Sequence, residues 1–400
     1  MTGQPQAPRA VVMGPHYPYP PASGGVKRTL RILETIARAG AEVHYFTTED
    51  PERGAADGLA ALDLHAHVVP DGLDRPSDRI RQHLRRRPAR HSSQLVARMA
   101  DLEREGAAWV QVEGVTDSAY LLHRWTVPRI LSAQNVDSNV MWMHAGSMPP
   151  RSVARLRERY HTHRFVRTER RVGAVADVVL CVSEQDAVHF RAVAPRVVVA
   201  PNGVDDRLFS VDPSLGPGED IVFFGQMTYG PNLAGIRRFL AEGWPVLARL
   251  RPHARLVIAG QASRELLGDI AGPRVLVVGL VDDIADLLAS ARVVVVPIWV
   301  GGGTRLKVLE TLAASRPLVG TTLGVAGVGF IDGAHGLTAE TPADLAARVA
   351  ELCEDTERAR RLGAAGRELA QGFRWDRALA PAEAIFREYV ERFAATQRGG

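Results

Sequence analysis

The chain has 400 residues, of which 46% are hydrophobic and 24% are charged. Its length suits two domains of ordinary size, and its composition is typical of a packed globular enzyme, which excludes a disordered, fibrous or membrane-spanning chain. The 49 basic residues barely exceed the 45 acidic ones, and this net charge of +4 excludes a polycationic nucleic-acid binder.

Cysteine usage and hydrophobicity indicate a cellular location. Cys181 and Cys353 stand far apart, so neither a disulfide framework nor a cysteine metal site is expected. The polar N-terminus does not resemble a secretory signal, and no apolar run approaches the ~20 residues that span a bilayer. The longest candidate, Val293 to Val300, is broken by Pro297. We therefore expect a cytoplasmic protein in a reducing compartment.

Short β-branched runs recur along the chain and alternate with amphipathic stretches. These runs begin at Ala10, Ile130, Val178, Ile221, Arg255 and Val293. They predict buried parallel strands. The stretch Val26 to Ala39, with Val26, Leu30, Leu33 and Ala37 on one face, predicts a crossover helix. The alternation predicts an α/β fold with parallel sheets.

A turn signal divides the chain after the strand-like RVVVA, at Pro201, Asn202 and Gly203. We expect Rossmann-like domains over residues 1–203 and 204–372, and a helix in residues 373–400 that packs back onto the first domain. Open parallel sheets bind ligands outside the carboxyl ends of their strands. The cleft between the two sheets is therefore the expected site.

The strongest local pattern is PIWVGGGTRLKVLETLAASRPLVGT, from Pro297 to Thr321. It predicts a strand, a glycine loop and a helix. The glycines at 301 to 303 let the backbone approach a ligand, and the helix directs free N–H groups and its positive dipole end at that ligand. The loop is therefore a predicted anion site, which a diphosphate would fit.

Three residues of this segment, Thr304, Lys307 and Glu310, step by three and can border one ligand. Lys307 and Arg305 can neutralise phosphate charge, and Glu310 can accept hydrogen bonds from ribose hydroxyls. The alternative is an ordinary amphipathic helix with solvated charges after a glycine-rich turn.

The pattern P-x3-G-x-G-T-R-x-K-x-x-E, followed by Arg-Pro-Leu-Val, resembles the donor-site signature of one branch of the retaining family 4 glycosyltransferases. PPASGGVKRTL, APNGVD, IVFFGQMTYGPN, LVIAGQ and LVDDIADLLASARVVVVP also stand in the family's order, so the resemblance covers nearly the whole chain. It implies the GT-B fold and retaining, metal-independent transfer of a hexosyl-type sugar from a nucleotide diphosphate donor. The acceptor would be a hydroxyl in glycan, glycolipid or natural-product biosynthesis. UDP is favoured by analogy alone.

The resemblance also implies donor contacts outside the glycine loop. The implied residues are Gly24 and Gly25 for the phosphates, Gly225, Gln226, Gly260 and Gln261 for the diphosphate or nucleoside, Val281 for the base, and the backbone of Gly302, Gly303 and Thr304. Competing interpretations are a plain helix start at the first pair, tight turns at the strand ends, and a helix cap at Asp282 or Asp283.

Three positions depart from the family's pattern. Many members have a glutamate for the transferred sugar where this chain has Gly302, an arginine of a diphosphate clamp where it has Gln226, and a histidine where it has Gln134. These changes put more of the phosphate charge on Arg305 and Lys307. They also leave open the interpretation as a GT-B accessory protein that binds a nucleotide sugar without transferring it. A nucleotide-sugar epimerase is a further alternative, which agrees less well with the motifs.

Acceptor binding is expected in the first domain. Gln134, Asn135 and Asp137 follow a predicted strand and can bind hydroxyls of the sugar or acceptor, although a turn and helix cap explains them equally well. The basic stretch Asp78 to His91 leaves peripheral contact with an anionic membrane open, but a solvated helix and loop is favoured. The sequence has no Asp-x-Asp and no clustered His or Cys set, so we expect no metal and no cofactor besides the nucleotide sugar.

Overall fold

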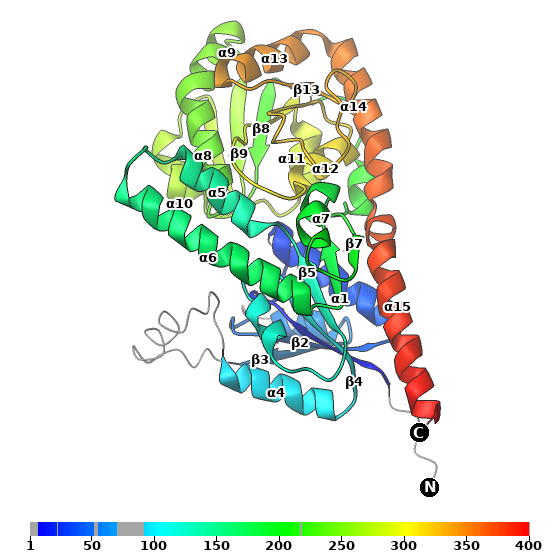
Figure 1. Cartoon of the computed structure of the whole chain (residues 1–400). Helices are drawn as coiled ribbons and strands as arrows, with labels where there is room; N and C mark the ends of the chain where they lie inside the picture. Colours follow the sequence, from blue (N-terminus) through cyan, green and yellow to red (C-terminus); the bar gives the residue numbers. More distant parts are fainter. Residues whose placement is uncertain (1–6, 22, 52–54, 70–91, 217, 400) are drawn as a thin grey trace. The chain divides into compact units, whose positions relative to one another are not determined.

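The computed structural model describes residues 7–21, 23–51, 55–69, 92–216 and 218–399. The chain forms two compact units, of which unit 1 comprises Met1–Pro201 and Leu379–Gly400, and unit 2 comprises Asn202–Ala378 (Figure 1). The division falls two residues before the boundary expected at residue 203. The basic stretch Asp78 to His91 lies outside the described residues.

Unit 1 is built on a seven-stranded parallel sheet in the order β3-β2-β1-β4-β5-β6-β7. Its strands are β1 (Arg9–Met13), β2 (Glu42–Thr47), β3 (Leu64–Val68), β4 (Ala107–Glu113), β5 (Arg129–Ala133), β6 (Val178–Cys181) and β7 (Val197–Val199). The strand order reverses between β1 and β4. Ligands of such sheets bind at the carboxyl ends of strands beside this reversal.

The helices of unit 1 are α1 (Gly24–Arg38), α2 (Ala55–Ala60), α4 (Ser93–Arg104), α5 (Asp137–Ser147), α6 (Val153–Val175) and α7 (Glu184–Arg191). α1 begins two residues before the predicted start because the Ser23 hydroxyl accepts a hydrogen bond from the backbone N–H of Val26, 3.3 Å away, and caps the helix. Leu30 and Leu33 are buried as predicted. Ala37 is exposed, which contradicts its predicted place on the buried face, and Ile36 is buried in its stead.

The last helix, α15 (Trp375–Gly399), starts two residues after the expected position because residues 371–373 form a 3-10 turn. From Leu379 onward it counts with unit 1. There the Phe386 ring stacks on Trp109 of β4, with ring centroids 5.7 Å apart, and Glu388 pairs with Arg196 at 2.7 Å. Both aromatic side chains are fully buried, so this part of the helix is a piece of the core of unit 1.

Unit 2 contains a six-stranded parallel sheet in the order β10-β9-β8-β11-β12-β13. Its strands are β8 (Asp220–Phe224), β9 (Arg255–Ala259), β10 (Val275–Gly279), β11 (Val293–Val296), β12 (Leu318–Gly320) and β13 (Leu337–Thr338). The strand order reverses between β8 and β11. The predicted α/β class with parallel sheets is thus confirmed in both units.

The helices of unit 2 are α8 (Gly230–Arg238), α9 (Trp244–Leu250), α10 (Ser263–Leu267), α11 (Ile284–Ser290), α12 (Leu306–Ala313), α13 (Pro342–Glu354) and α14 (Thr356–Ala370). They enclose a core in which Val293 to Val296 of β11 are completely buried. A strand buried on both faces explains this unbroken valine run. Across the described ranges of both units, no helix combines the length and the apolar character needed to cross a membrane.

Candidate functional site

Three neighbouring strands of unit 2 end in glycines with left-handed backbone. The φ angles are +147° at Gly225, +127° at Gly260 and +83° at Gly279. The loops are tied together: Gly225 N–H donates to the Ala259 carbonyl at 3.0 Å, and Gly260 N–H donates to the Gly279 carbonyl at 2.7 Å. A Cβ on Gly260 would lie 2.0 Å from the carbonyl oxygen of Gly225, so only glycine fits there. The carboxyl ends of β8, β9 and β10 thereby present backbone without side chains.

Lys307 projects from the first turn of α12 to the end of β8, and its side chain is buried, with 9% of the residue exposed. Its ammonium lies 4.3 Å from the ring centroid of Phe223, and a Cβ on Gly225 would come within 2.9 Å of Nζ. Burial and, to a smaller extent, the Arg305 charge lower the pKa of Lys307 to about 7, and Glu310 opposes the shift. Because burial destabilises the protonated form of this lysine, an anionic ligand beside the ammonium would stabilise it.

Asn232, in the first turn of α8, is the hydrogen-bond acceptor of Lys307. Its Oδ1 accepts from Nζ at 2.7 Å, and its Nδ2 donates to the Gln226 carbonyl at 2.8 Å. Asn232 is not among the residues predicted from the sequence. The available indication was an asparagine directly after Gly230 and Pro231, at a helix start that follows a buried strand.

The glycine loop leads into α12 as its pattern predicted. Gly301 and Gly303 have φ angles of +146° and +67°. The Arg305 guanidinium donates to the Gly303 carbonyl at 3.2 Å, and a Cβ on Gly301 would lie 3.1 Å from its Nη2. α12 begins at Leu306, so its first N–H groups, which have no acceptor within the helix, follow directly after the loop. Helix N-termini that directly follow glycine-rich loops bind anions in other proteins.

Thr304 and Glu310 are both buried, at 7% exposure each. The Thr304 carbonyl accepts from Asn202 Nδ2 at 3.0 Å, while its Oγ1 is buried without a hydrogen-bond partner among the described residues. Every residue from Lys307 to Ala313 is buried. The alternative of solvated charges on an amphipathic helix is therefore wrong for Lys307 and Glu310.

The remaining predicted residues of unit 2 lie at the ends of the same strands. The Gln261 carbonyl accepts from the Met227 N–H at 2.9 Å, which joins the loops after β8 and β9. Val281 is half-buried and packs against the core. The predicted helix cap is confirmed for Asp283, whose Oδ1 accepts from the Ala285 N–H at 2.8 Å and which also pairs with Arg207 at 3.2 Å.

In unit 1, the start of α1 lies against the end of β5. A Cβ on Gly25 would be 3.0 Å from Gln134 Oε1, and Gln134 Nε2 donates to Thr29 Oγ1 at 3.2 Å. Gly24, next along the helix, is exposed. The structure thus brings together Gly25 and Gln134, which are 109 positions apart in the sequence.

Asp137 is the first residue of α5 and accepts a hydrogen bond from Thr116 at 3.4 Å. Burial, assisted by the Glu169 carboxylate, raises the pKa of Asp137 to about 7. The alternative explanation of Asn135 to Ser138 is a turn and helix cap, but this described helix start has no side-chain cap hydrogen bond. Glu169 of α6 accepts from the Ser138 N–H at 3.1 Å instead, and Asn135 is half-buried.

Behind this face lie two buried charges that the sequence analysis did not single out. Glu113, at the end of β4, and Arg28 of α1 are 0% and 1% exposed. Burial lowers the pKa of Arg28 to about 10 and Glu113 opposes the shift, while burial raises the pKa of Glu113. Arg28 donates to the carbonyls of Ala200 and Pro201, at 2.7 and 3.0 Å. It therefore ties α1 to the last residues of unit 1 before unit 2.

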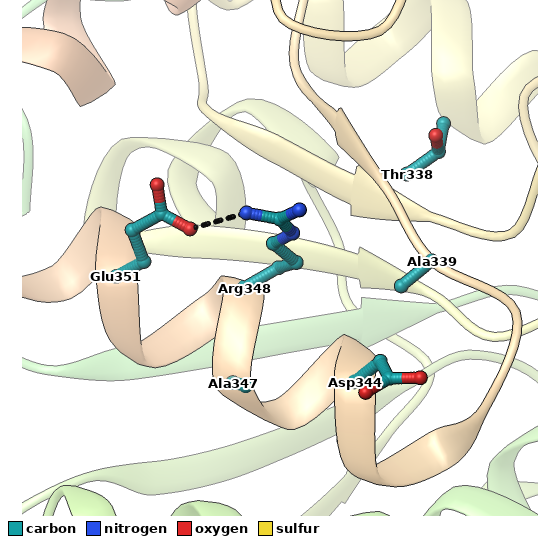
Figure 2. Close-up of a pocket in the computed structure, with 6 residues that line it drawn as sticks. All are labelled: Thr338, Ala339, Asp344, Ala347, Arg348 and Glu351. Atoms are coloured by element: carbon teal, nitrogen blue, oxygen red, sulfur yellow. Dashed lines mark hydrogen bonds and ion pairs between the residues drawn. The ribbon is translucent and has the colours of Figure 1, made fainter.

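A separate pocket of about 340 Å³ lies beside β13 and α13 of unit 2 (Figure 2). It is lined by Thr338, Ala339, Asp344, Ala347, Arg348 and Glu351. Its polar groups form interactions within α13 and at its N-terminus: Arg348 pairs with Glu351 at 3.0 Å, and Asp344 accepts from the hydroxyl of the N-cap residue Thr341 at 2.6 Å. None of the predicted site residues lines it. In the described part of the chain, no group of three or more metal-ligating side chains could hold a metal ion.

Comparison with known proteins finds a family model that matches part of unit 2. Residues 218–355 match the family of glycosyl transferases group 1. A protein of Methanocaldococcus jannaschii described as an uncharacterized glycosyltransferase is 30% identical over 109 residues. This match spans 27% of the chain and about a third, 31%, of that relative.

Solved structures resemble the whole chain. A sucrose-phosphate synthase from Thermosynechococcus elongatus superposes with a TM-score of 0.69 at 19% identity, covering 97% of this chain and 100% of the other. The Anabaena protein HepE, in complex with UDP-glucose, has a TM-score of 0.65 at 14% identity, with 97% and 99% covered. The two units therefore have the GT-B fold of these structures, and within unit 2 residues 218–355 match the model of the group 1 glycosyl transferases.

Proposed function

We propose that the protein is a glycosyltransferase that binds a nucleotide diphosphate sugar on unit 2 and transfers the sugar to a hydroxyl acceptor. One observation carries the proposal: a buried lysine ammonium lies at the carboxyl end of β8, beside three glycine-ended strands and the start of α12. A diphosphate would bring negative charge to this ammonium, whose hydrogen-bond acceptor, Asn232, is neutral. UDP is the favoured nucleotide, because HepE is described in complex with UDP-glucose.

In this proposal the diphosphate is held by cations and backbone amides. Lys307, Arg305 and the amides of residues 302–304 stabilise the charge that grows on the leaving phosphate as the glycosidic bond breaks. Glu310 accepts hydrogen bonds from the ribose. The strand-end residues Gly225, Gln226, Gly260 and Gln261 border the diphosphate or nucleoside, and Val281 borders the base.

The acceptor side of the proposal belongs to unit 1. Gly24 and Gly25, at the start of α1, are proposed to border the donor phosphates. Gln134, Asn135 and Asp137 supply groups that bind hydroxyls of the sugar or acceptor. Asp137 suits this role because its pKa of about 7 lets it donate or accept a hydrogen bond near neutral pH. We further propose that transfer retains the anomeric configuration and needs no metal, with the leaving diphosphate taking the acceptor proton.

The test is the release of nucleoside diphosphate from UDP-, GDP-, dTDP- and ADP-glucose, with and without hydroxyl acceptors. Lys307→Met should lower turnover roughly 100-fold or more, since it removes a close cation from the transition state. The matched control is Arg360→Met, which removes an exposed cation from α14 and should leave turnover unchanged. Proton NMR of the product gives the anomeric configuration, and an inverted product would contradict retention.

The second candidate is an accessory protein that binds a nucleotide sugar without transferring it. The residues at positions 134, 226 and 302 favour it, because they lack the side chains found in many relatives of the resembling branch. Tight binding of one nucleotide sugar with no release of nucleotide across the acceptor panel would establish this candidate in place of the enzyme.

A further inference from the structure

We propose that Asn232 is a positioning residue for donor binding: its amide fixes the Lys307 ammonium at the end of β8, and its neutrality leaves that charge to the donor diphosphate. The inference rests on the proposed function and deepens it, because it names what aims the main phosphate-binding cation. Asn232 itself need not touch the donor.

The amide of Asn232 can have only one orientation. The Gln226 carbonyl can only accept a hydrogen bond, so the group that faces it at 2.8 Å must be Nδ2. The opposite atom, Oδ1, then accepts from Lys307 Nζ at 2.7 Å. With 7% of the residue exposed, water competes little for either bond. The loop after β8 therefore holds the amide, and the amide holds the ammonium.

The backbone at Asn232 is also fixed. Pro231 stands in the first turn of α8, where its fixed φ suits a helix start, and the Asn232 N–H donates to the Tyr229 carbonyl at 3.0 Å. Both the main chain and the side chain of Asn232 are thus held before any ligand binds. Such preorganisation is what electrostatic stabilisation of a transition state requires.

The surroundings of Nζ explain why a neutral partner matters. β8 contributes the Phe223 ring and the bare backbone of Gly225, and α8 contributes Asn232, none of which titrates. The charged groups that act on Lys307 are Arg305, which disfavours its protonated form, and Glu310, which favours it. A carboxylate at position 232 would sit at hydrogen-bond distance from the ammonium and neutralise it. It would also repel an arriving diphosphate.

Two substitutions separate this role from a structural one. Asn232→Ala removes the acceptor and leaves the ammonium unfixed, whereas Asn232→Asp keeps the size and the hydrogen bond but adds charge. We expect donor affinity to fall roughly tenfold or more in Asn232→Asp, since a charged partner changes a buried ion's energetics strongly. The pH at which affinity begins to fall should rise by about one unit, because the carboxylate stabilises the protonated lysine.

The experiment is calorimetric titration of the full chain with UDP-, GDP-, dTDP- and ADP-glucose, followed by a pH series from 6.0 to 8.5 with the tightest binder. Asn139→Asp is the control, because it places the same charge on an exposed position of α5. Melting curves check that each variant folds. Weaker binding and a raised pH midpoint in Asn232→Asp, with weaker binding in Asn232→Ala, support the inference.

The outcomes separate this inference from the proposed function. If the wild type binds a donor and Asn232→Asp has the same affinity and pH midpoint, only the role of Asn232 is overturned. If Asn232→Asp does not fold, wild-type affinity in Asn232→Ala overturns the role in the same way. If the wild type binds none of the four donors, the proposed function fails, and this inference fails with it.

Discussion

Donor affinity should decrease as the pH rises through neutrality, because Lys307 must be protonated to hold a diphosphate. Its pKa in the free protein is about 7, and phosphate charge raises the pKa in the complex, so binding takes up a proton. Below pH 7 the lysine is already charged and affinity is constant. Above pH 7 the dissociation constant increases up to tenfold per pH unit, which amounts to about 30-fold between pH 6.0 and 8.5.

The assay is isothermal titration with UDP-glucose, whose esterified diphosphate has no proton to lose in this range, unlike free UDP with a phosphate pKa near ~6. Titrations in two buffers of different ionisation enthalpy should reveal uptake of about half a proton at pH 7. Lys307→Met should bind more weakly and show neither the pH dependence nor the proton uptake. Wild-type affinity that stays flat from pH 6.0 to 8.5 would refute the assignment of Lys307 as the phosphate-binding cation.

Further predictions concern stability, measured by denaturant unfolding or melting of the ligand-free protein. Gly260→Ala should lower the free energy of unfolding by about 2 kcal/mol or more, because the added methyl group would lie 2.0 Å from a carbonyl oxygen and the backbone is left-handed. Gly268→Ala should leave the free energy of unfolding unchanged, because the space around Gly268 is open. Equal stability of these two variants would contradict the packing of the strand ends. Lys307→Met should stabilise the free protein, and the gain in free energy of unfolding should be larger at pH 6 than at pH 9.5. The reason is that the pKa of Lys307 is lower in the folded state than in the unfolded state. The destabilisation by the buried charge is therefore complete at low pH and decreases as the pH rises above about 7. A stabilisation that grows with pH would mean that the sign is wrong. Phe386→Ala should cost about 3–5 kcal/mol, since it empties a fully buried site against Trp109; a cost under 1 kcal/mol would show that α15 is not part of the core of unit 1.

The strands that could be predicted from the sequence are those whose buried residues are mostly apolar. β6 and β11 are continuous hydrophobic runs, and β8 is one from Ile221 onward, so their sequence alone indicates a strand buried on both faces. β4 is also wholly buried, but it contains Gln111 and Glu113, whose side chains bond to one another at 2.7 Å. Polar residues interrupt the hydrophobic pattern of a buried strand, and the hydrogen-bond partners that allow their burial are known only from the folded structure.

In the candidate site, too, some residues could be predicted from the sequence and others could not. The glycine loop, Lys307 and Glu310 lie within ten positions, so their proximity follows from helix periodicity. The contact between Asn232 and Lys307 joins residues 75 positions apart, and the glycine at 225 leaves the space in which they meet. Arg28 and Glu113 lie on different elements as well. Sequence periodicity cannot predict side-chain contacts that form only because β8, α8 and α12 meet in the folded structure.

A crystal structure of the protein with UDP-glucose would show directly where the donor binds. The assignment of Lys307 as the phosphate-binding cation predicts the diphosphate within hydrogen-bond distance of Lys307 Nζ and of the backbone amides at the start of α12, with the ribose hydroxyls on Glu310. A nucleotide bound elsewhere, for example in the pocket beside Arg348 and Glu351, with Lys307 still bonded only to Asn232, would contradict it.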